Sequence, residues 1–254
     1  MHNALLLLIA GALRVLGQNN WDPHPVHSDS NVSFILIGDS TTANGTTPNS
    51  GGWGNGFCAS LWDGTPCINR GKNGATTGTY VAEGYWSAAL SDVEQQVAAG
   101  RRTIVTLQFG HNDQKVALAE SMAANLTYMA NTLKSAGAVP LLVSSLTRRG
   151  FNGSTVSDTL QPFAEASLDV ARKLLLPSID LHGASLKYVN KIGVDAAHRL
   201  NRLPNDNTHL NPAGVVVFGQ LVADLVAKVL TGLPFEQTNG WNISAQLAAG
   251  EAIF

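Results

Sequence analysis

Short apolar runs separated by longer helical patterns limit the folds open to this chain more than any other feature. Runs at 33–37, 103–109 and 139–144, with weaker ones at 66–69 and 177–180, are typical of buried strands. Apolar residues recur at helical spacing over about 118–136, 158–175 and 212–231. Strands that alternate with helices of this length predict parallel βαβ units, and therefore a single α/β domain around a central parallel sheet.

Length and composition agree with one globular domain. The 254 residues are enough to bury a sizeable core, and only 13% of them are charged. The 16 basic and 18 acidic residues give a formal net charge of -2, without a long run of either sign. We therefore expect neither nucleic acid nor a membrane as a partner, and we expect a monomer. Because no His, Asp or Glu cluster has ligand spacing, we also expect no metal.

The start of the chain has the pattern of a secretion signal. Residues 5–13 form an apolar run too short to span a bilayer, and Val15 and Gly17 are small enough for a cleavage site. We expect 1–17 to be a signal peptide, with an ordinary N-terminal helix as the alternative. The mature domain would then span 18–254, with 232–254 as a C-terminal extension.

Five N-glycosylation sequons agree with a secreted, extracellular protein. One sequon occurs often by chance, but five behind a signal-like start favour the eukaryotic secretory route. They begin at Asn31, Asn44, Asn125, Asn152 and Asn242.

The chain has two cysteines, Cys58 and Cys67. In an oxidising compartment they can pair only with each other within the chain. The alternative is two buried free thiols, and two cysteines are too few for a structural zinc site.

Two polar segments directly follow predicted strands. The segment 38–42 (GDSTT) comes after the first strand, and 110–113 (GHND) follows the run 103–109. In open parallel sheets, ligands bind beyond the carboxyl ends of the strands, so both segments are candidates for one site. Ser40 could be a nucleophile if a base takes its proton, or it could simply cap a helix.

Asp206 and His209 are the candidate partners of such a serine. They lie three residues apart in a polar loop before the last predicted helix. The carboxylate can accept a proton from one imidazole nitrogen and leave the other nitrogen for Ser40. The alternative is a capping aspartate beside an unrelated histidine. Asn112 and Gly74 could donate to an oxyanion, although both residue types are common in turns.

In this order, the segments around Ser40, Gly74, Asn112 and His209 resemble those of the SGNH (GDSL-type) hydrolases. The resemblance implies a three-layer α/β/α flavodoxin-like fold and a serine esterase that hydrolyses oxygen esters without a cofactor. It implies Ser40 as the nucleophile, His209 as its base and Asp206 as the residue that orients His209. The oxyanion hole would consist of the Ser40 and Gly74 N–H groups and the Asn112 side chain.

Within that superfamily, the segments 38–41 (GDST), 52–55 (GWGN) and 109–113 (FGHND) are similar to the rhamnogalacturonan acetylesterase group. This similarity implies a secreted carbohydrate esterase that removes acetyl groups from pectin, a polysaccharide of the plant cell wall. An esterase for acetylxylan or a lipid ester is the alternative among enzymes. The alternative from another class is a carbohydrate-binding protein with an inactive site.

Several residues are candidates for binding a sugar. Trp53, in a glycine-rich loop, could stack on a sugar ring or could pack in the core. Cations near the site would pair with galacturonate carboxylates, or would be solvated surface charges. These cations are Arg70, Lys72, Arg199 and Arg202. For His111 and Asp113 we expect structural hydrogen bonds.

Overall fold

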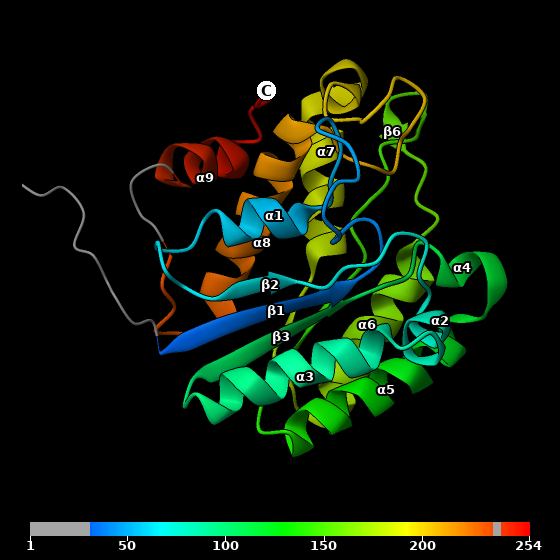
Figure 1. Ribbon diagram of the computed structural model, residues 1–254. Coiled ribbons are helices and arrows are strands. Elements are labelled where there is room, and N and C mark those ends of the chain that lie inside the picture. Colours follow the sequence, from blue (N-terminus) through cyan, green and yellow to red (C-terminus); the bar gives the residue numbers. More distant parts are fainter. Residues whose placement is uncertain (1–30, 236–239) are drawn as a thin grey trace, which may run out of the picture.

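A five-stranded parallel sheet forms the centre of the molecule in the computed structural model, which describes residues 31–235 and 240–254 (Figure 1). The strands run in the order β2-β1-β3-β4-β7, which is the order of flavodoxin-like doubly wound folds. The predicted α/β fold class is therefore confirmed. The strands are β1 (Val32–Gly38), β2 (Cys67–Asn69), β3 (Arg102–Gln108), β4 (Val139–Val143) and β7 (Ser178–Ile179). The predicted signal peptide lies outside the described residues.

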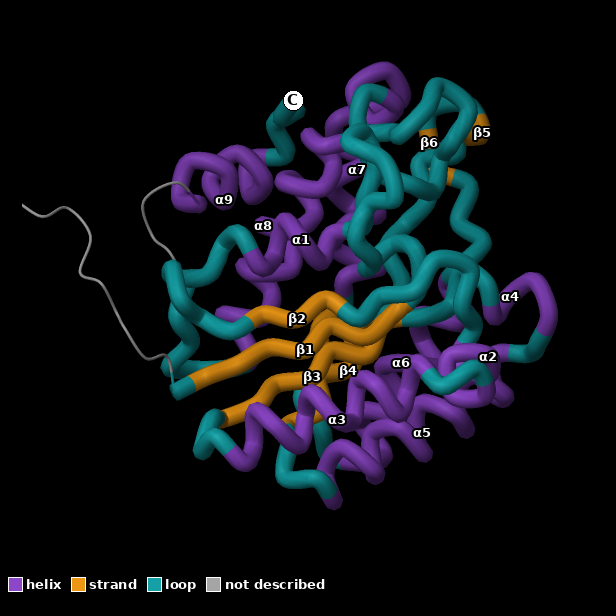
Figure 2. The backbone as a smooth tube through the Cα atoms, in the orientation of Figure 1, coloured by secondary structure: helices purple, strands orange, loops and turns teal. Residues whose placement is uncertain are grey.

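Helices cover both faces of the sheet (Figures 1 and 2). One layer contains α1 (Trp53–Cys58), α7 (Leu181–His198), α8 (Pro212–Val229) and α9 (Gly240–Ala249). The other contains α2 (Thr77–Ala82), α3 (Tyr85–Ala98), α5 (Ala119–Ser135) and α6 (Gln161–Leu174). The short helix α4 (Asp113–Val116) and the hairpin of β5 (Phe151–Asn152) and β6 (Thr155–Val156) lie beyond the carboxyl ends of the strands.

The alternation of side chains along β1 divides the core in two. Phe34 and Leu36 belong to the cluster shared with α1, α7 and α8, whereas Ile35 and Ile37 belong to the cluster shared with α3, α5 and α6. All four side chains are fully buried. A strand that is apolar on both faces is typical of a parallel sheet covered by helices on each side.

The helix α8 is among the most apolar elements of the described chain. Its N-cap Asn211 accepts a hydrogen bond from the Gly214 N–H, and Pro212 occupies the first turn, as the sequence predicts. By length and composition alone it could cross a membrane. In this fold Val217, Phe218 and Val222 pack in the core beside α1, which is the position of an interior helix.

The helix α7 is not predicted by the spacing of apolar residues. Two glycines, Gly183 and Gly193, interrupt its pattern, and Gly193 has a φ of 78°, which kinks the helix. The predicted strand at 177–180 is correspondingly shorter, because Asp180 is the N-cap of α7 and accepts from the Gly183 N–H. A capping aspartate thus ends the strand and begins the helix within one residue.

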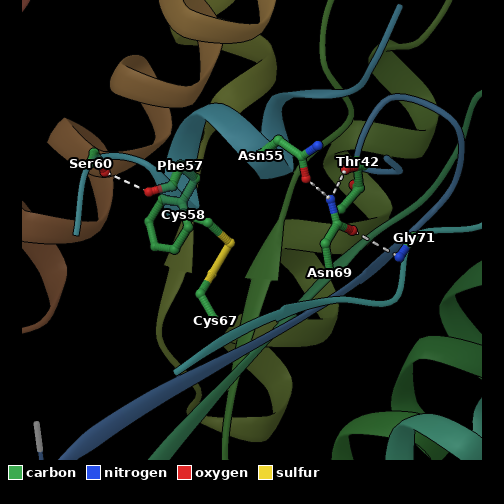
Figure 3. The surroundings of a disulfide bond; sticks show 8 residues. All are labelled: Thr42, Asn55, Phe57, Cys58, Ser60, Cys67, Asn69 and Gly71. Atoms are coloured by element: carbon green, nitrogen blue, oxygen red, sulfur yellow. Dashed lines mark hydrogen bonds between the residues drawn. A yellow bond between two sulfur atoms is a disulfide. The ribbon is translucent and has the colours of Figure 1, made fainter. Parts of the chain in front are cut away.

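A disulfide joins Cys58 at the end of α1 to Cys67 at the start of β2, with a Cα–Cα distance of 5.7 Å (Figure 3). At the other end of β2, Asn69 Nδ2 donates to the Thr42 carbonyl at 2.8 Å and to Asn55 Oδ1 at 3.1 Å. The short edge strand β2 is therefore attached both to α1 and to the turn that follows β1. The pairing predicted for the two cysteines is present.

The sequon asparagines remain predicted glycosylation sites. Four of the five side chains are exposed, those of Asn31, Asn44, Asn152 and Asn242. Asn125 is half-buried, and its amide donates to Thr77 Oγ1 at 3.0 Å.

Replacement of both cysteines by alanine (C58A/C67A) should destabilise the fold without unfolding it. The bridge spans a sequence separation of 9 residues. Closing a loop of that size restricts the unfolded chain by about 2.5–3 kcal/mol. Urea denaturation of the double variant should show this loss. Dithiothreitol should shift the midpoint of the wild type toward that of the variant and leave the variant unchanged. Equal midpoints for both proteins would contradict the expected contribution.

Candidate active site

The parallel pairing of β1 with β3 places two polar turns side by side. Gly38 at the end of β1 pairs with Gln108 at the end of β3. A Cβ atom on Gly38 would lie 2.3 Å from Thr42 Oγ1 and 2.6 Å from the Gln108 carbonyl, so only glycine fits there. The chain then turns through Asp39 to Ser40, directly beyond the sheet.

The side chain of Gln108 holds this turn. Its Oε1 faces the hydroxyls of Thr41 and Thr42, each at 2.8 Å, and the indole N–H of Trp53 at 3.0 Å. Trp53 also donates its backbone N–H to the Thr41 carbonyl at 2.8 Å. The Trp53 side chain is 0% exposed. The hypothesis that Trp53 stacks on a sugar is therefore wrong, because its ring is buried where it supports the Ser40 turn.

Ser40, His209 and Asp206 form a continuous hydrogen-bonded chain. The Ser40 Oγ lies 3.0 Å from His209 Nε2. The other ring nitrogen, Nδ1, lies 3.0 and 2.9 Å from the two carboxylate oxygens of Asp206. A carboxylate in that position favours the tautomer with the proton on Nδ1, which leaves Nε2 free to accept the serine proton.

The carboxylate of Asp206 is kept ionised by its partners. Burial works to raise its pKa, but hydrogen bonds from the backbone and ring of His209, together with the Thr208 N–H, outweigh burial and lower the pKa. Arg202 adds an ion pair to Asp206 with a distance of 2.7 Å between Nη2 and Oδ2. At neutral pH the group that faces His209 is therefore an anion.

Arg149 is buried beneath the loop 201–209 and holds that loop, which carries His209, by hydrogen bonds. Its guanidinium donates to Asn201 Oδ1 at 2.5 Å and to the His209 carbonyl at 2.9 Å, and its N–H donates to the Asn207 carbonyl at 2.8 Å. Burial lowers the pKa of Arg149 to about 9, although Asp206 opposes the shift. The side chain is therefore still charged at neutral pH.

Donors for a developing oxyanion lie on the neighbouring turns. Gly74 has a φ of 79°, a conformation that favours glycine, and no atom lies within 4 Å of the position of a Cβ, so its backbone is open to the pocket. Asn112 is 9% exposed. Its Nδ2 donates to the Ala75 carbonyl at 3.1 Å, which uses one of two N–H groups and leaves the second for a ligand.

Of the two neighbours of Asn112, Asp113 has the structural hydrogen bonds expected for it, whereas neither ring nitrogen of His111 has a hydrogen-bond partner among the described residues. Asp113 Oδ1 accepts from the Thr77 N–H at 3.0 Å and from its hydroxyl at 2.6 Å. Burial raises the pKa of Asp113, and the bonds from Thr77 oppose this only in part. His111 Nδ1 lies 3.5 Å from Asp39 Oδ2. Burial also works to raise the pKa of Asp39, but His111 and Thr41 lower it.

These turns surround a pocket of about 290 Å³. Ser40, Gly74, Asn112 and His209 all line it, so the structure brings together four segments that are distant in the sequence. Its other lining residues are Asn44, Gly45, Thr46, Ser50, Gly51, Asn73, Lys115 and Arg202. Within the described chain this lining contains two cations and no carboxylate, a charge balance that suits a developing anion.

Residues 36–216 match the model of the GDSL-like lipase/acylhydrolase family. The chain belongs to this family. It is therefore a carboxylic ester hydrolase, and the recognition made from the sequence is confirmed.

Similar proteins include two of Bacillus subtilis strain 168. The rhamnogalacturonan acetylesterase RhgT is 30% identical over 81% of this chain and 93% of its own length. The probable rhamnogalacturonan acetylesterase YesY is 27% identical over 81% of this chain and 96% of its own length.

Solved structures share the fold at lower identity. Axe2, an acetylxylan esterase of Geobacillus stearothermophilus, has a TM-score of 0.56 at 17% identity, over 83% of this chain and 99% of its own. A Bacillus subtilis protein of known crystal structure has a TM-score of 0.68 at 20% identity over 78% of this chain. The match spans only 57% of that second protein.

Of the four cations expected near the site of this GDSL-like protein, only Arg202 lines the catalytic pocket. Arg70 pairs with both carboxylate oxygens of Asp92. Lys72 lies over the ring of Tyr85, and Arg199 lies over the ring of Phe254. The expectation that Arg70, Lys72 and Arg199 would face a substrate is therefore wrong, because each side chain is directed to another partner.

Three residues that matter in this region were not found from the sequence. Arg148 and Arg149 follow β4, and the rule that selected the turns after β1 and β3 would have found them too. Lys115 lies three residues after Asn112, one helical turn along. Arg148 and Arg202 also line a larger pocket of about 850 Å³ that adjoins the catalytic one.

The acceptor Oε1 of Gln108 should be essential to the Ser40 turn. Gln108→Leu keeps the approximate size of the side chain but leaves the buried donors of Thr42 and Trp53 without their acceptor. The Thr41 hydroxyl can still donate to Asp39 Oδ1 at 2.8 Å. Unpaired buried donors cost about 1–3 kcal/mol each, so the free energy of unfolding should fall by roughly 2–5 kcal/mol. Urea denaturation would measure it, and kcat should fall as well.

Thr106→Val is the matched control on the same strand. Thr106 is buried, and its hydroxyl has no hydrogen-bond partner in the described part of the chain. Its removal should leave the free energy of unfolding unchanged or raise it, because a buried hydroxyl without a partner only adds a desolvation cost. Equal losses in the two variants would show that Gln108 matters only as core volume.

Proposed function

We propose that this protein is a secreted serine acetylesterase that removes O-acetyl groups from a plant cell-wall polysaccharide, acetylated rhamnogalacturonan in particular. The observation that carries the proposal is the 3.0 Å contact between Ser40 Oγ and His209 Nε2, with His209 held by Asp206. The rhamnogalacturonan acetylesterase relative, 30% identical, supports the substrate.

In the first half of the reaction, Ser40 Oγ attacks the acetyl carbonyl while His209 Nε2 takes its proton. The carbonyl oxygen becomes an oxyanion, which accepts hydrogen bonds from the Ser40 N–H, the Gly74 N–H and the second N–H of Asn112 Nδ2. As the intermediate collapses, His209 gives the proton to the departing sugar oxygen. The products are a free sugar hydroxyl and an acetyl ester of Ser40.

In the second half, water takes the place of the sugar. His209 accepts a proton from the water, whose oxygen attacks the acetyl carbonyl of the modified Ser40. The same donors hold the second oxyanion. Collapse of this intermediate returns the proton to Ser40 Oγ and releases acetate. Asp206 remains an anion throughout and stabilises the imidazolium that forms twice in each cycle.

The lining of the catalytic pocket supports a short acyl group. The pocket volume is about 290 Å³, and none of the described residues around it has an apolar side chain. A long acyl chain would find no apolar side chain to pack against in this small pocket, so its burial there would gain little, because the hydrophobic gain depends on apolar contact area. This observation favours acetyl esters over lipid esters.

The adjoining pocket of about 850 Å³ supports an acidic polysaccharide. Arg148 is partly buried in its wall and forms no salt bridge among the described residues; the one carboxylate in the described lining, Asp206, is paired with Arg202. Its guanidinium is shared between the Thr208 hydroxyl and the His111 carbonyl. Leu203, which is 57% exposed, and Pro204 add an apolar wall. A sugar acid offers both a carboxylate for the guanidinium and a C–H face for the apolar wall.

Secretion is part of the proposal because of the N-terminal apolar segment and the sequons. Asn44 lies at the margin of the catalytic pocket and is exposed, so a glycan on it would stand at the entrance. An active protein therefore carries that glycan turned outward or does not carry it.

Ser40→Ala should abolish hydrolysis of p-nitrophenyl acetate and labelling by a fluorophosphonate, because among the described residues no other hydroxyl is hydrogen-bonded to a ring nitrogen of His209. The circular-dichroism spectrum should not change. Ser91→Ala, on the exposed surface of α3, is the matched control and should keep the full rate and labelling. Retained activity in Ser40→Ala would refute the mechanism. Absence of labelling in the wild type would instead favour an inactive carbohydrate-binding protein.

Acetate release should be fastest from acetylated rhamnogalacturonan, slower from acetylxylan and slowest from a long-chain ester.

Arg148→Gln should lower the rate on the acidic polymer roughly tenfold, which corresponds to the loss of one charge-assisted hydrogen bond of about 1.5 kcal/mol. The effect on neutral acetylxylan should be much smaller.

Arg199→Gln removes the same charge away from both pockets and should leave the preference unchanged. A faster rate on acetylxylan would replace the proposed polysaccharide and keep the acetylesterase. Equal losses on both polymers in Arg148→Gln would exclude carboxylate recognition by this arginine.

A further inference from the structure

Lys115 contacts the oxygen of the Asn112 side-chain amide, whereas the Ala75 carbonyl contacts its nitrogen. Lys115 lies in the short helix α4, and its Nζ donates to Asn112 Oδ1 at 2.9 Å. The side chain is exposed, lines the catalytic pocket and has no carboxylate partner among the described residues. Since no acid neutralises it, the positive charge of Lys115 can polarise the Asn112 amide and make the pocket more electropositive.

The two partners of the Asn112 amide define its orientation. The Ala75 carbonyl only accepts, so the atom 3.1 Å from it must be the nitrogen. The Lys115 ammonium only donates, so the atom beside it must be the oxygen. A flipped amide would place its oxygen against the Ala75 carbonyl. The partly negative oxygen, and no longer an N–H group, would then face any oxyanion in the pocket.

The charge on Lys115 also makes Asn112 a stronger donor. A hydrogen bond from an ammonium group to an amide oxygen draws electron density away from the nitrogen, which makes the remaining N–H more positive. That N–H is the one available to the pocket. Stabilisation of an oxyanion is most effective when its donors are oriented before the reaction, because no reorganisation is then needed.

We propose that Lys115 is a positioning residue of the reaction, which fixes and polarises the Asn112 amide so that one N–H is directed at the oxyanion. This inference rests on the proposed function, because it takes Asn112 as an oxyanion donor. Lys115 itself does not contact the reacting atoms.

The first test compares Lys115→Met and Lys115→Arg in hydrolysis of p-nitrophenyl acetate. Lys115→Met should lower kcat about tenfold, less than the roughly 10²–10³-fold expected for losing the donor itself in Asn112→Ala. KM should stay within about twofold. The same donors stabilise the oxyanion in both halves of the reaction, so formation and hydrolysis of the acetyl-enzyme should be slowed by similar factors. Lys115→Arg keeps a charged donor and should recover most of the lost rate.

The second test is a double-mutant cycle with Asn112→Ala. If Lys115 acts through Asn112, adding Lys115→Met to Asn112→Ala should cause no further loss of kcat. Lys134→Met, in the last turn of α5, removes an exposed lysine elsewhere and should leave kcat unchanged. The lysine variants should melt at the temperature of the wild type, because both lysines are exposed.

Two results would overturn the inference. One is a normal kcat in Lys115→Met while Asn112→Ala is slow, which would leave the oxyanion donor intact and remove Lys115 from its support. The other is a full further loss in the double variant, which would show that Lys115 acts independently of Asn112. A normal rate in Asn112→Ala would instead contradict the proposed oxyanion hole itself, and with it any route through Lys115.

Discussion

The parallel pairing of β1 with β3 is the constraint on which the site depends. It joins Gly38 to Gln108, so that both strands end at the same level and their turns leave the sheet together. A slip of one residue would turn every side chain of β1 to the opposite face. Gln108 would then no longer face Thr41, Thr42 and Trp53, and the turn at Ser40 would lose its support.

The charges around the site are arranged in two groups. Asp206 lies behind His209 and is held anionic by hydrogen bonds and by Arg202. On the substrate side, Lys115 and Arg202 line the pocket, and no described acid does. A negative group behind the imidazole and positive groups in front favour transfer of a proton to His209 and growth of negative charge on the substrate.

The fold class, the five strands and the helices α5, α6 and α8 could be predicted, but the helices α3 and α7 and the roles of single aromatic and charged residues could not. The runs that became β1, β3 and β4 are buried on both faces, which makes their pattern plain. The position of Trp53 depends on Gln108, a residue 55 positions away. The partners of Arg70 and Arg199 are likewise set by packing. Such contacts have no local signature in the chain.

The sequence by itself determined the parallel α/β class, the order of the segments around Ser40, Gly74, Asn112 and His209, and the family. The fold class follows from the spacing of apolar residues and from the positions of glycine and proline. The family follows from short motifs that can be recognised without knowledge of the residues packed around them. Only the tertiary structure decided that Trp53 is buried, that Arg148 lines the adjoining pocket and that Lys115 reaches the Asn112 amide. Those outcomes depend on which side chains meet across the sheet edge, and the distances that decide them exist only after the chain has folded.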